Sequence, residues 1–174
     1  MTIKKIITEP NKILRQKSIS IEKFGEEEQK LMDDMLETMY HSNGIGLAAI
    51  QIGVPKRIIV MDISKDKEKK SPMYFVNPVI MNRNSEKSTY EEGCLSVPNF
   101  FAEIHRPKKC EVKYLDYNGQ NQTLKAEGLL ATCIQHEMDH LEGILFIDYL
   151  SKLKKTMIVK KLSKQKNSPD RIIV

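Results

Sequence analysis

Residues 129–141 read LLATCIQHEMDHL, and this stretch decides the fold. Apolar side chains fall on more than one side of a helix drawn through it, which predicts a largely buried helix. Gly143 follows closely and is a suitable C-terminal stop. Because a buried helix must be covered by other elements, we expect it at the centre of the fold.

The segments around this helix have strand and helix patterns in an irregular order. They comprise a helix over 26–42 that Asn43-Gly44 ends, strands over 57–63 and 73–81 joined by the charged segment 64–72, a hairpin over 110–128 that turns at Asn118-Gly119, and a basic helix over about 151–165. No regular βαβ alternation is visible, which favours an α+β fold. We therefore predict antiparallel sheets around a central helix, with a further helix at the C-terminal end.

The composition is typical of one globular domain: 174 residues, 40% hydrophobic and 29% charged. No run approaches the ~20 apolar residues of a membrane span, and the N-terminal residues lack the apolar core of a secretion signal. Three cysteines, Cys94, Cys110 and Cys133, are too few for a disulfide scaffold. These features predict a cytoplasmic protein that does not contact a membrane.

Positive charge is concentrated at the C-terminal end of the chain. Residues 151–174 hold eight basic residues and one acidic residue, a net charge of +7, whereas the whole chain carries +5. The body is therefore mildly acidic and carries a basic appendage. Without tryptophan, and without aromatic residues interleaved among the basic ones, the sequence gives little support for a platform that stacks single-stranded nucleic acid.

The central helix contains the pattern His136-Glu137-Met138-Asp139-His140. Residues four apart lie on one helix face, so both imidazoles can reach one divalent ion, with Glu137 near its open position. A five-residue pattern also arises by chance, and the two histidines would then only cap or pack. The pattern predicts a metal-dependent hydrolase, and such a site needs a third protein ligand.

Several residues are candidates for the third ligand. Phe146 occupies the position of the third histidine in one protease class, which excludes that class. Cys133 shares the helix face, but it lies too far along the helix axis for its short side chain to reach the metal. It is expected in a pocket wall or the core.

Cys94 lies between Gly93 and Pro98, which predict an irregular backbone that could bring its thiolate into a cleft, although a buried turn cysteine is equally consistent. Cys110 fits the hydrophobic core, and His41 and His105 fit the surface.

The segment GIGLAAIQ, residues 44–51, has the glycine spacing of a dinucleotide-binding fingerprint. That fingerprint follows a strand and opens a helix, whereas this segment follows a helix. We therefore predict a loop whose backbone passes close to another group, with Gln51 offering an amide donor. A tight helix-to-strand connection is the alternative.

GIGLAAIQ (44–51), EGCLSVP (92–98) and QHEMDH (135–140) together resemble the three signature motifs of the peptide deformylase family, and the resemblance covers most of the chain. It implies a catalytic domain over 1–150, with 151–174 as a basic helix and tail of the same domain. It implies metal ligands Cys94, His136 and His140, an acid/base Glu137, and carbonyl activation by Gln51 and the Leu95 N–H. The implied substrate pocket contains Gly46, Ile45, Thr132 and Cys133.

The resemblance further implies one divalent metal ion, with Fe²⁺ as the physiological ion and Zn²⁺ as an alternative. The implied substrate is the N-terminal formylmethionine of nascent peptides in a bacterial cytoplasm, and the implied partner is the ribosome, which the basic C-terminal helix would contact. Phe101 departs from the family, because many relatives have arginine there, while Arg106 is kept. Two other classes stay open: an endopeptidase that does not depend on Cys94, and a metal-binding or RNA-binding module that tolerates loss of Glu137.

Overall fold

The computed structural model describes residues 2–64 and 69–167, and it has three helices, seven strands and three short 3₁₀ helices in that part of the chain. In chain order these are η1 (Lys12–Arg15), α1 (Glu26–His41), β1 (Gly46–Ala48), η2 (Ala49–Ile52), β2 (Ile58–Met61), β3 (Met73–Arg83), β4 (Lys87–Cys94), β5 (Val97–Pro107), β6 (Lys109–Leu115), β7 (Asn121–Glu127), α2 (Gly128–Leu141), η3 (Phe146–Tyr149) and α3 (Lys152–Asn167). The predicted α+β class is confirmed.

The strands form two antiparallel sheets. One has five strands in the order β1-β2-β3-β6-β7, and the other is the two-stranded hairpin β4-β5. The predicted hairpin at Asn118-Gly119 joins β6 to β7, and Gly119 takes φ +75°, a left-handed conformation that glycine adopts without strain. Of the predicted connection 64–72, residues 65–68 lie outside the described part of the chain.

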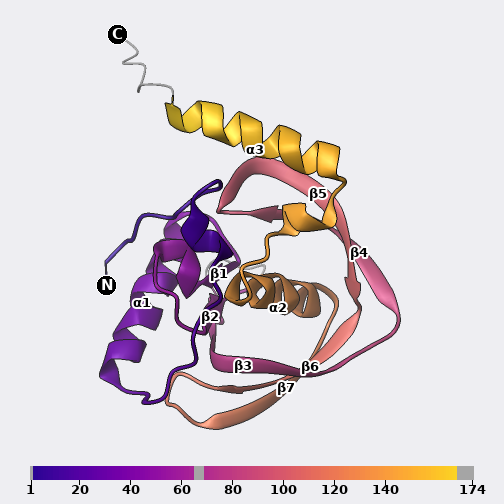
Figure 1. Cartoon of the computed structure of the whole chain (residues 1–174). Helices are drawn as coiled ribbons and strands as arrows, with labels where there is room; N and C mark the ends of the chain where they lie inside the picture. Colours follow the sequence, from indigo (N-terminus) through magenta and orange to yellow (C-terminus); the bar gives the residue numbers. More distant parts are fainter. Residues whose placement is uncertain (1, 65–68, 168–174) are drawn as a thin grey trace.

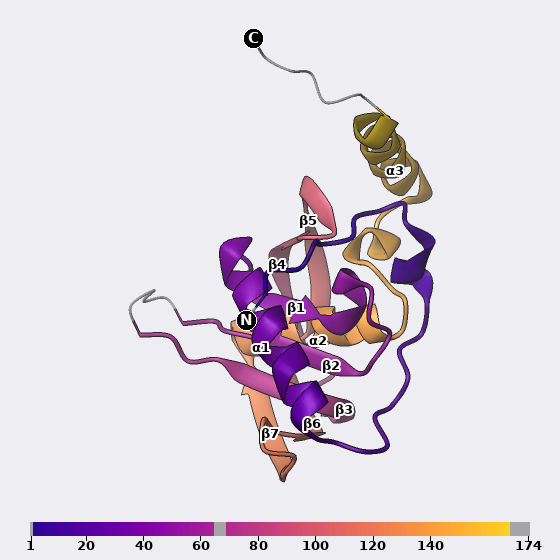
Figure 2. The ribbon, with the colours of Figure 1, turned by 90° about the vertical axis from the view of Figure 1, so that its left-hand side faces the viewer.

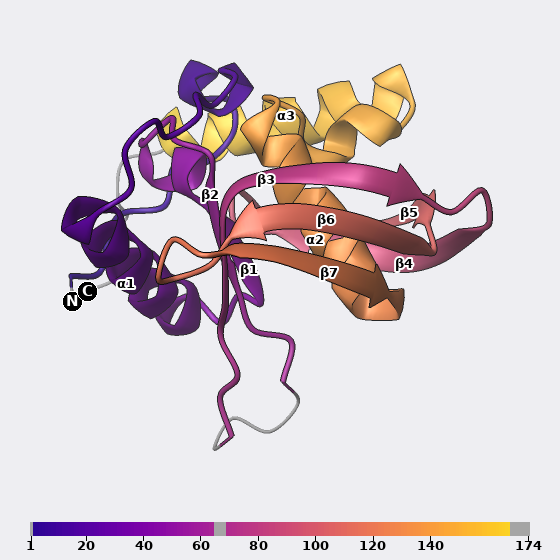
Figure 3. The ribbon, with the colours of Figure 1, turned by 90° about the horizontal axis from the view of Figure 1, so that it is seen from below.

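Helix α2 lies in the interior and is contacted by both sheets (Figures 1 and 3). Ten of its fourteen residues are buried, because its apolar residues face more than one neighbour. Ala131, Ile134 and Leu141 pack in one core cluster with Phe75 of β3 and Val112 of β6. The central position predicted for this helix is confirmed, and Gly143 follows it with φ +75°.

Helix α1 lies over β1 and β2 (Figure 2). It packs with a row of methionines, Met32, Met35 and Met39, none of which is exposed. Glu28 accepts a hydrogen bond from the Gly25 N–H at 3.0 Å, which satisfies a donor at the helix start. The described residues contain no helix that is both long and apolar enough to cross a membrane.

One expectation about strands is wrong. The segment 44–51 is not simply a loop: Gly46–Ala48 form an edge strand paired with β2, and η2 follows. Gly93 and Pro98 also lie in strands, at the end of β4 and in β5, but the irregular backbone predicted between them is confirmed, because the pairing register shifts between Gly93 and Cys94. Small residues and proline obscured the strand pattern, and pairing with a distant partner stabilises the extended backbone at these positions.

The sequence also predicts that Leu150, Leu153 and Met157 hold one side of the C-terminal helix to the body, and this prediction is largely wrong. Leu153 is 82% exposed and Met157 48%, whereas Ile158 and Leu162 are buried against Val97 and Phe146. Only Leu150, which precedes the helix, packs as expected. Apolar residues occur around most of α3, so the sequence could not show which side faces the body. The predicted boundary between residues 150 and 151 falls between η3 and α3.

Candidate metal centre and active site

Three side chains of types that can bind a metal ion converge between the two sheets. His136 and His140 come from α2, and Cys94 comes from the last position of β4. One ligand atom from each lies within 4.8 Å of the others, and no other group of this kind is found in the described residues. The Cys94 Sγ lies 3.2 Å from the His140 Nε2. The site therefore joins a helix pair fixed by local spacing to a cysteine brought there by strand pairing.

The two imidazoles have different surroundings. His136 Nδ1 lies 2.9 Å from the Glu92 Oε2, and because a carboxylate only accepts, Nδ1 donates and Nε2 is the atom left available to a metal ion. Burial tends to lower the pKa of His136, but the contacts with Cys94 and Glu92 raise it by more, so the net shift is upward. Burial and the neighbouring His136 lower the pKa of His140, which keeps that imidazole neutral, the form that binds metals.

Glu92 is itself held by a buried arginine. Arg106 donates to both of its carboxylate oxygens, at 2.6 and 3.0 Å, and also to Asp139 at 2.8 Å. Burial tends to raise the pKa of Glu92, but His136 and Arg106 lower it to a net decrease, so the carboxylate stays charged. Sequence reasoning did not assign Glu92 a role. Its position two residues before Cys94, and hence on the same face of β4, was the available signal.

Glu137 is buried beside these three side chains, and one of its oxygens, Oε2, has no hydrogen-bond partner in the part of the chain that the structure describes. Burial raises the pKa of Glu137 to about 7, with His136 opposing this effect. A Cβ on Gly46 would clash with this carboxylate and contact the Cys133 sulfur. A carboxyl group with a pKa near neutrality can both accept and donate a proton.

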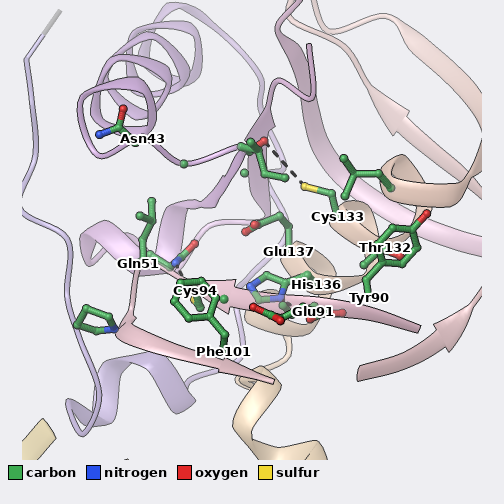
Figure 4. Close-up of a pocket in the computed structure, with 18 of the residues that line it drawn as sticks. Asn43, Gln51, Tyr90, Glu91, Cys94, Phe101, Thr132, Cys133, His136 and Glu137 are labelled. Carbon is green, nitrogen blue, oxygen red and sulfur yellow. Dashed lines mark hydrogen bonds and ion pairs between the residues drawn. The ribbon is translucent and has the colours of Figure 1, made fainter. Parts of the chain in front are cut away.

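Gln51 lies on the opposite side of Cys94 from His136 (Figure 4). Its Oε1 accepts from the Ala48 N–H at 2.8 Å, so its Nε2 points the other way, toward the Ser96 Oγ at 3.1 Å and the Cys94 Sγ at 3.6 Å. Leu95 directly follows Cys94 in the turn between β4 and β5. Two potential donors, the Gln51 amide and the Leu95 N–H, thus lie next to the cysteine.

A pocket of about 480 Å³ opens beside these residues. All four residues predicted to bind substrate line it: Ile45, Gly46, Thr132 and Cys133. Cys133 is buried, its Sγ lies 3.9 Å from the Ile45 carbonyl oxygen, and burial raises the pKa of its thiol well above the usual value. Cys133 is not in the ligand group, in agreement with the distance argument. Cys110 is buried in the core, and His41 and His105 are exposed, as expected.

A helical histidine pair, a thiol from a hairpin and a buried glutamate beside a pocket are the features of a metal-dependent hydrolase. The sequence model of the polypeptide deformylase family matches residues 3–156. The peptide deformylase of Pelagibacter ubique (strain HTCC1062) is 73% identical over the full length of both chains. That of Rhizobium meliloti (strain 1021) is 54% identical over 94% of each chain.

Solved structures agree with these sequences. The crystal structure of peptide deformylase from Ehrlichia chaffeensis in complex with actinonin has a TM-score of 0.92 and 44% identity, over 97% of this chain and all of that one. The chain belongs to the polypeptide deformylase family. It is a hydrolase that removes N-formyl groups from nascent polypeptides. The family is metal-dependent, and the Cys94, His136 and His140 group fits a metal ion.

Proposed function

We propose that Cys94, His136 and His140 bind one divalent metal ion, and that Glu137 transfers protons during removal of the formyl group from N-terminal formylmethionine. The observation that carries this proposal is the convergence of the three ligand atoms within 4.8 Å. One thiolate and two imidazoles suit Fe²⁺ or Zn²⁺, and three protein ligands leave a position open for substrate. Family resemblance favours Fe²⁺ as the physiological ion.

When bound, a divalent ion supplies positive charge that polarises the formyl carbonyl and lowers the pKa of water. Glu137 accepts a proton from the water that attacks the formyl carbon. As the bond between the formyl carbon and the nitrogen breaks, Glu137 returns that proton to the nitrogen, and the products are formate and a free amine. The burial of Glu137 supports this double role, because its pKa of about 7 is close to the working pH.

Two donors stabilise the carbonyl oxygen as negative charge develops on it. The Gln51 Nε2 is aimed past Cys94 because the Ala48 N–H holds the other end of the amide. The Leu95 N–H is the second donor. Donors fixed before the reaction stabilise an oxyanion without reorganisation, and removal of one such donor typically costs about 10²–10³-fold in rate.

The methionine side chain occupies the pocket lined by Ile45, Gly46, Thr132 and Cys133. The absence of a side chain at Gly46 leaves space beside the Glu137 carboxylate, where a Cβ would clash. The wall is mostly apolar, which matches an unbranched thioether. The pocket thus positions the first residue while its formyl group faces the metal ligands.

We also propose that the ribosome is a partner and that α3 contacts it. Lys152, Lys154, Lys160 and Lys161 are exposed on this helix, and residues 151–174 carry a net charge of +7. Such a segment is attracted to a polyanionic RNA surface at low salt. A substrate that emerges from the ribosome implies activity in the bacterial cytoplasm.

The experiment that tests the central proposal combines metal analysis with an activity assay. Protein purified without oxygen is expected to contain one divalent ion per chain and to release formate from a formyl-Met tripeptide. Chelation of the ion should abolish this activity, and Fe²⁺ should restore it. The same tripeptide without the formyl group is the control, and cleavage of its peptide bonds would instead indicate an endopeptidase. Full activity of the metal-free protein would contradict the proposal.

A further inference from the structure

Ser96 is a fully buried serine next to the two proposed carbonyl donors. It follows Leu95 in the turn between β4 and β5, and none of its surface is exposed. It is not among the described residues that line the pocket, whereas Gln51 is. A buried hydroxyl needs a hydrogen-bond partner, and the partner of this one is the Gln51 amide. The contact therefore links a residue behind the pocket wall to one that faces the substrate.

The Gln51 amide is held at both of its polar atoms. Its Oε1 accepts from the Ala48 N–H at 2.8 Å, and its Nε2 donates to the Ser96 Oγ at 3.1 Å. An amide nitrogen carries two hydrogens. With one of them directed to Ser96, the other points toward the metal-binding side chains, where the Cys94 Sγ lies 3.6 Å from Nε2. Ser96 thus sets the direction of the second hydrogen.

One short segment of the chain holds the backbones of both residues. The Ile7 N–H donates to the Gln51 carbonyl oxygen at 2.7 Å, and the Glu9 N–H donates to the Ser96 carbonyl oxygen at 2.8 Å. Glu9 is buried, and its carboxylate pairs with Arg15 at 3.2 Å, which holds the segment in place. Because the two backbones share this support, Gln51 and Ser96 are fixed relative to each other before a substrate binds.

We propose that Ser96 is a positioning residue, which directs one Nε2 hydrogen of Gln51 toward the formyl carbonyl oxygen by accepting the other. This inference rests on the proposed role of Gln51 as a donor to that oxygen. Ser96 acts only through the amide and does not contact the substrate. Without the Ser96 hydroxyl, the amide is held at Oε1 alone and can turn away from the carbonyl oxygen. A donor that must reorient during the reaction stabilises the transition state less.

Ser96→Ala tests this role, because it removes the acceptor and keeps the backbone contact with Glu9. We expect kcat on a formyl-Met tripeptide to fall about tenfold, the effect of one hydrogen bond. KM and metal content should stay unchanged, because the negative charge on the oxygen develops only in the transition state. Ser96→Cys nearly keeps the side-chain size but offers a weak acceptor, so a similar loss is expected. Unchanged kcat in both variants would overturn the proposal.

A double-mutant cycle separates a positioning role from a purely structural one. If Ser96 acts through Gln51, Ser96→Ala should cause almost no further loss of kcat in a protein that already carries Gln51→Ala. A residue that only stabilises the fold would cause the same fold-loss in both backgrounds. Equal losses would therefore overturn the inference.

Ser18→Ala is the matched control, because Ser18 is also a buried serine, and its Oγ has no hydrogen-bond partner among the described residues. This variant should keep the kcat of the unmodified protein, and a loss as large as that of Ser96→Ala would overturn the inference. Full kcat in Gln51→Ala would remove the donor role of Gln51 and this inference with it. Failure of the unmodified protein to release formate would instead contradict the proposed function, so the failures are distinguishable.

Discussion

The Nδ1 atom of His136 lies 2.9 Å from the Glu92 Oε2, so a residue of β4 fixes the orientation of an imidazole on α2. Glu92 is in turn held by two hydrogen bonds that Arg106 donates from β5. Partners of this kind set the tautomer and direction of a metal-binding histidine. The hairpin therefore contributes both the Cys94 thiol and the group that aims His136.

Loss of the Glu92 carboxylate should weaken metal binding. In Glu92→Gln the side chain keeps its shape but loses its negative charge. That charge pairs with Arg106 and strengthens the hydrogen bond that His136 donates. We expect metal affinity to fall by about 10–100-fold, the usual effect of losing such a partner. Competition with a chelator measures this. Glu91→Gln is the control, because Glu91 is adjacent and exposed, and equal affinity in both variants would contradict the assignment.

Glu137→Ala should keep the metal and lose most of the hydrolysis. Glu137 is proposed to transfer protons and is absent from the group of metal-ligating side chains. Proton transfer of this kind is typically worth about 10²–10⁴-fold in rate. Metal analysis and kcat/KM on the same sample give both quantities. Full activity in a metal-loaded Glu137→Ala protein would remove this residue from the mechanism.

Cys94 and Cys133 form a natural comparison, since both lie close to the site and only one belongs to the ligand group. Cys94→Ala should lose metal and activity together, because its thiolate is a proposed ligand. Cys133→Ala should keep the metal and change only the pocket. Metal content measured after anaerobic purification distinguishes them. Retention by Cys94→Ala with loss by Cys133→Ala would reverse the proposed ligand set.

The first residue of the peptide should be selected by side-chain length. Trimming the methionine side chain leaves part of the pocket unfilled, and each missing methylene costs about 1–3 kcal/mol in transition-state binding. We therefore expect formyl-Ala peptides to be cleaved at least tenfold less efficiently than formyl-Met peptides. The measurement is kcat/KM on matched tripeptides. Equal values would show that Ile45, Thr132 and Cys133 do not form the methionine pocket.

The charges of α3 should govern ribosome binding. Deletion of 151–174 is a poor test, because it removes the buried Ile158 and Leu162 and should therefore destabilise the body. Lys152, Lys154 and Lys160 are exposed, so their joint replacement by Gln should weaken co-sedimentation with ribosomes and reduce its salt dependence, while hydrolysis of a free tripeptide stays unchanged. Replacement of the exposed Lys87, Lys113 and Lys125 by Gln, on the strands, is the control with the same change in charge. If both triple variants weaken co-sedimentation equally, α3 has no specific role, and only a general electrostatic attraction to the ribosome remains.

The sequence by itself determined whatever depends on residues close together in the chain. The periodicity of 129–141 predicted α2, and the four-residue spacing placed His136 and His140 on one face, because helical geometry follows from local hydrogen bonds. Asn118-Gly119 predicted its hairpin for the same reason. Three short motifs together were sufficient to indicate the family.

Tertiary structure decided what depends on contacts between distant segments. Pairing of β4 with β5 brings Cys94 and Glu92 to α2 and places the Phe101 ring over Gly93. Pairing with β2 makes Gly46–Ala48 a strand. The burial of Ile158 and Leu162, and the exposure of Leu153, follow from the side of α3 that meets β5 and η3. Such choices depend on burial against a partner, and local sequence does not specify which partner will be present.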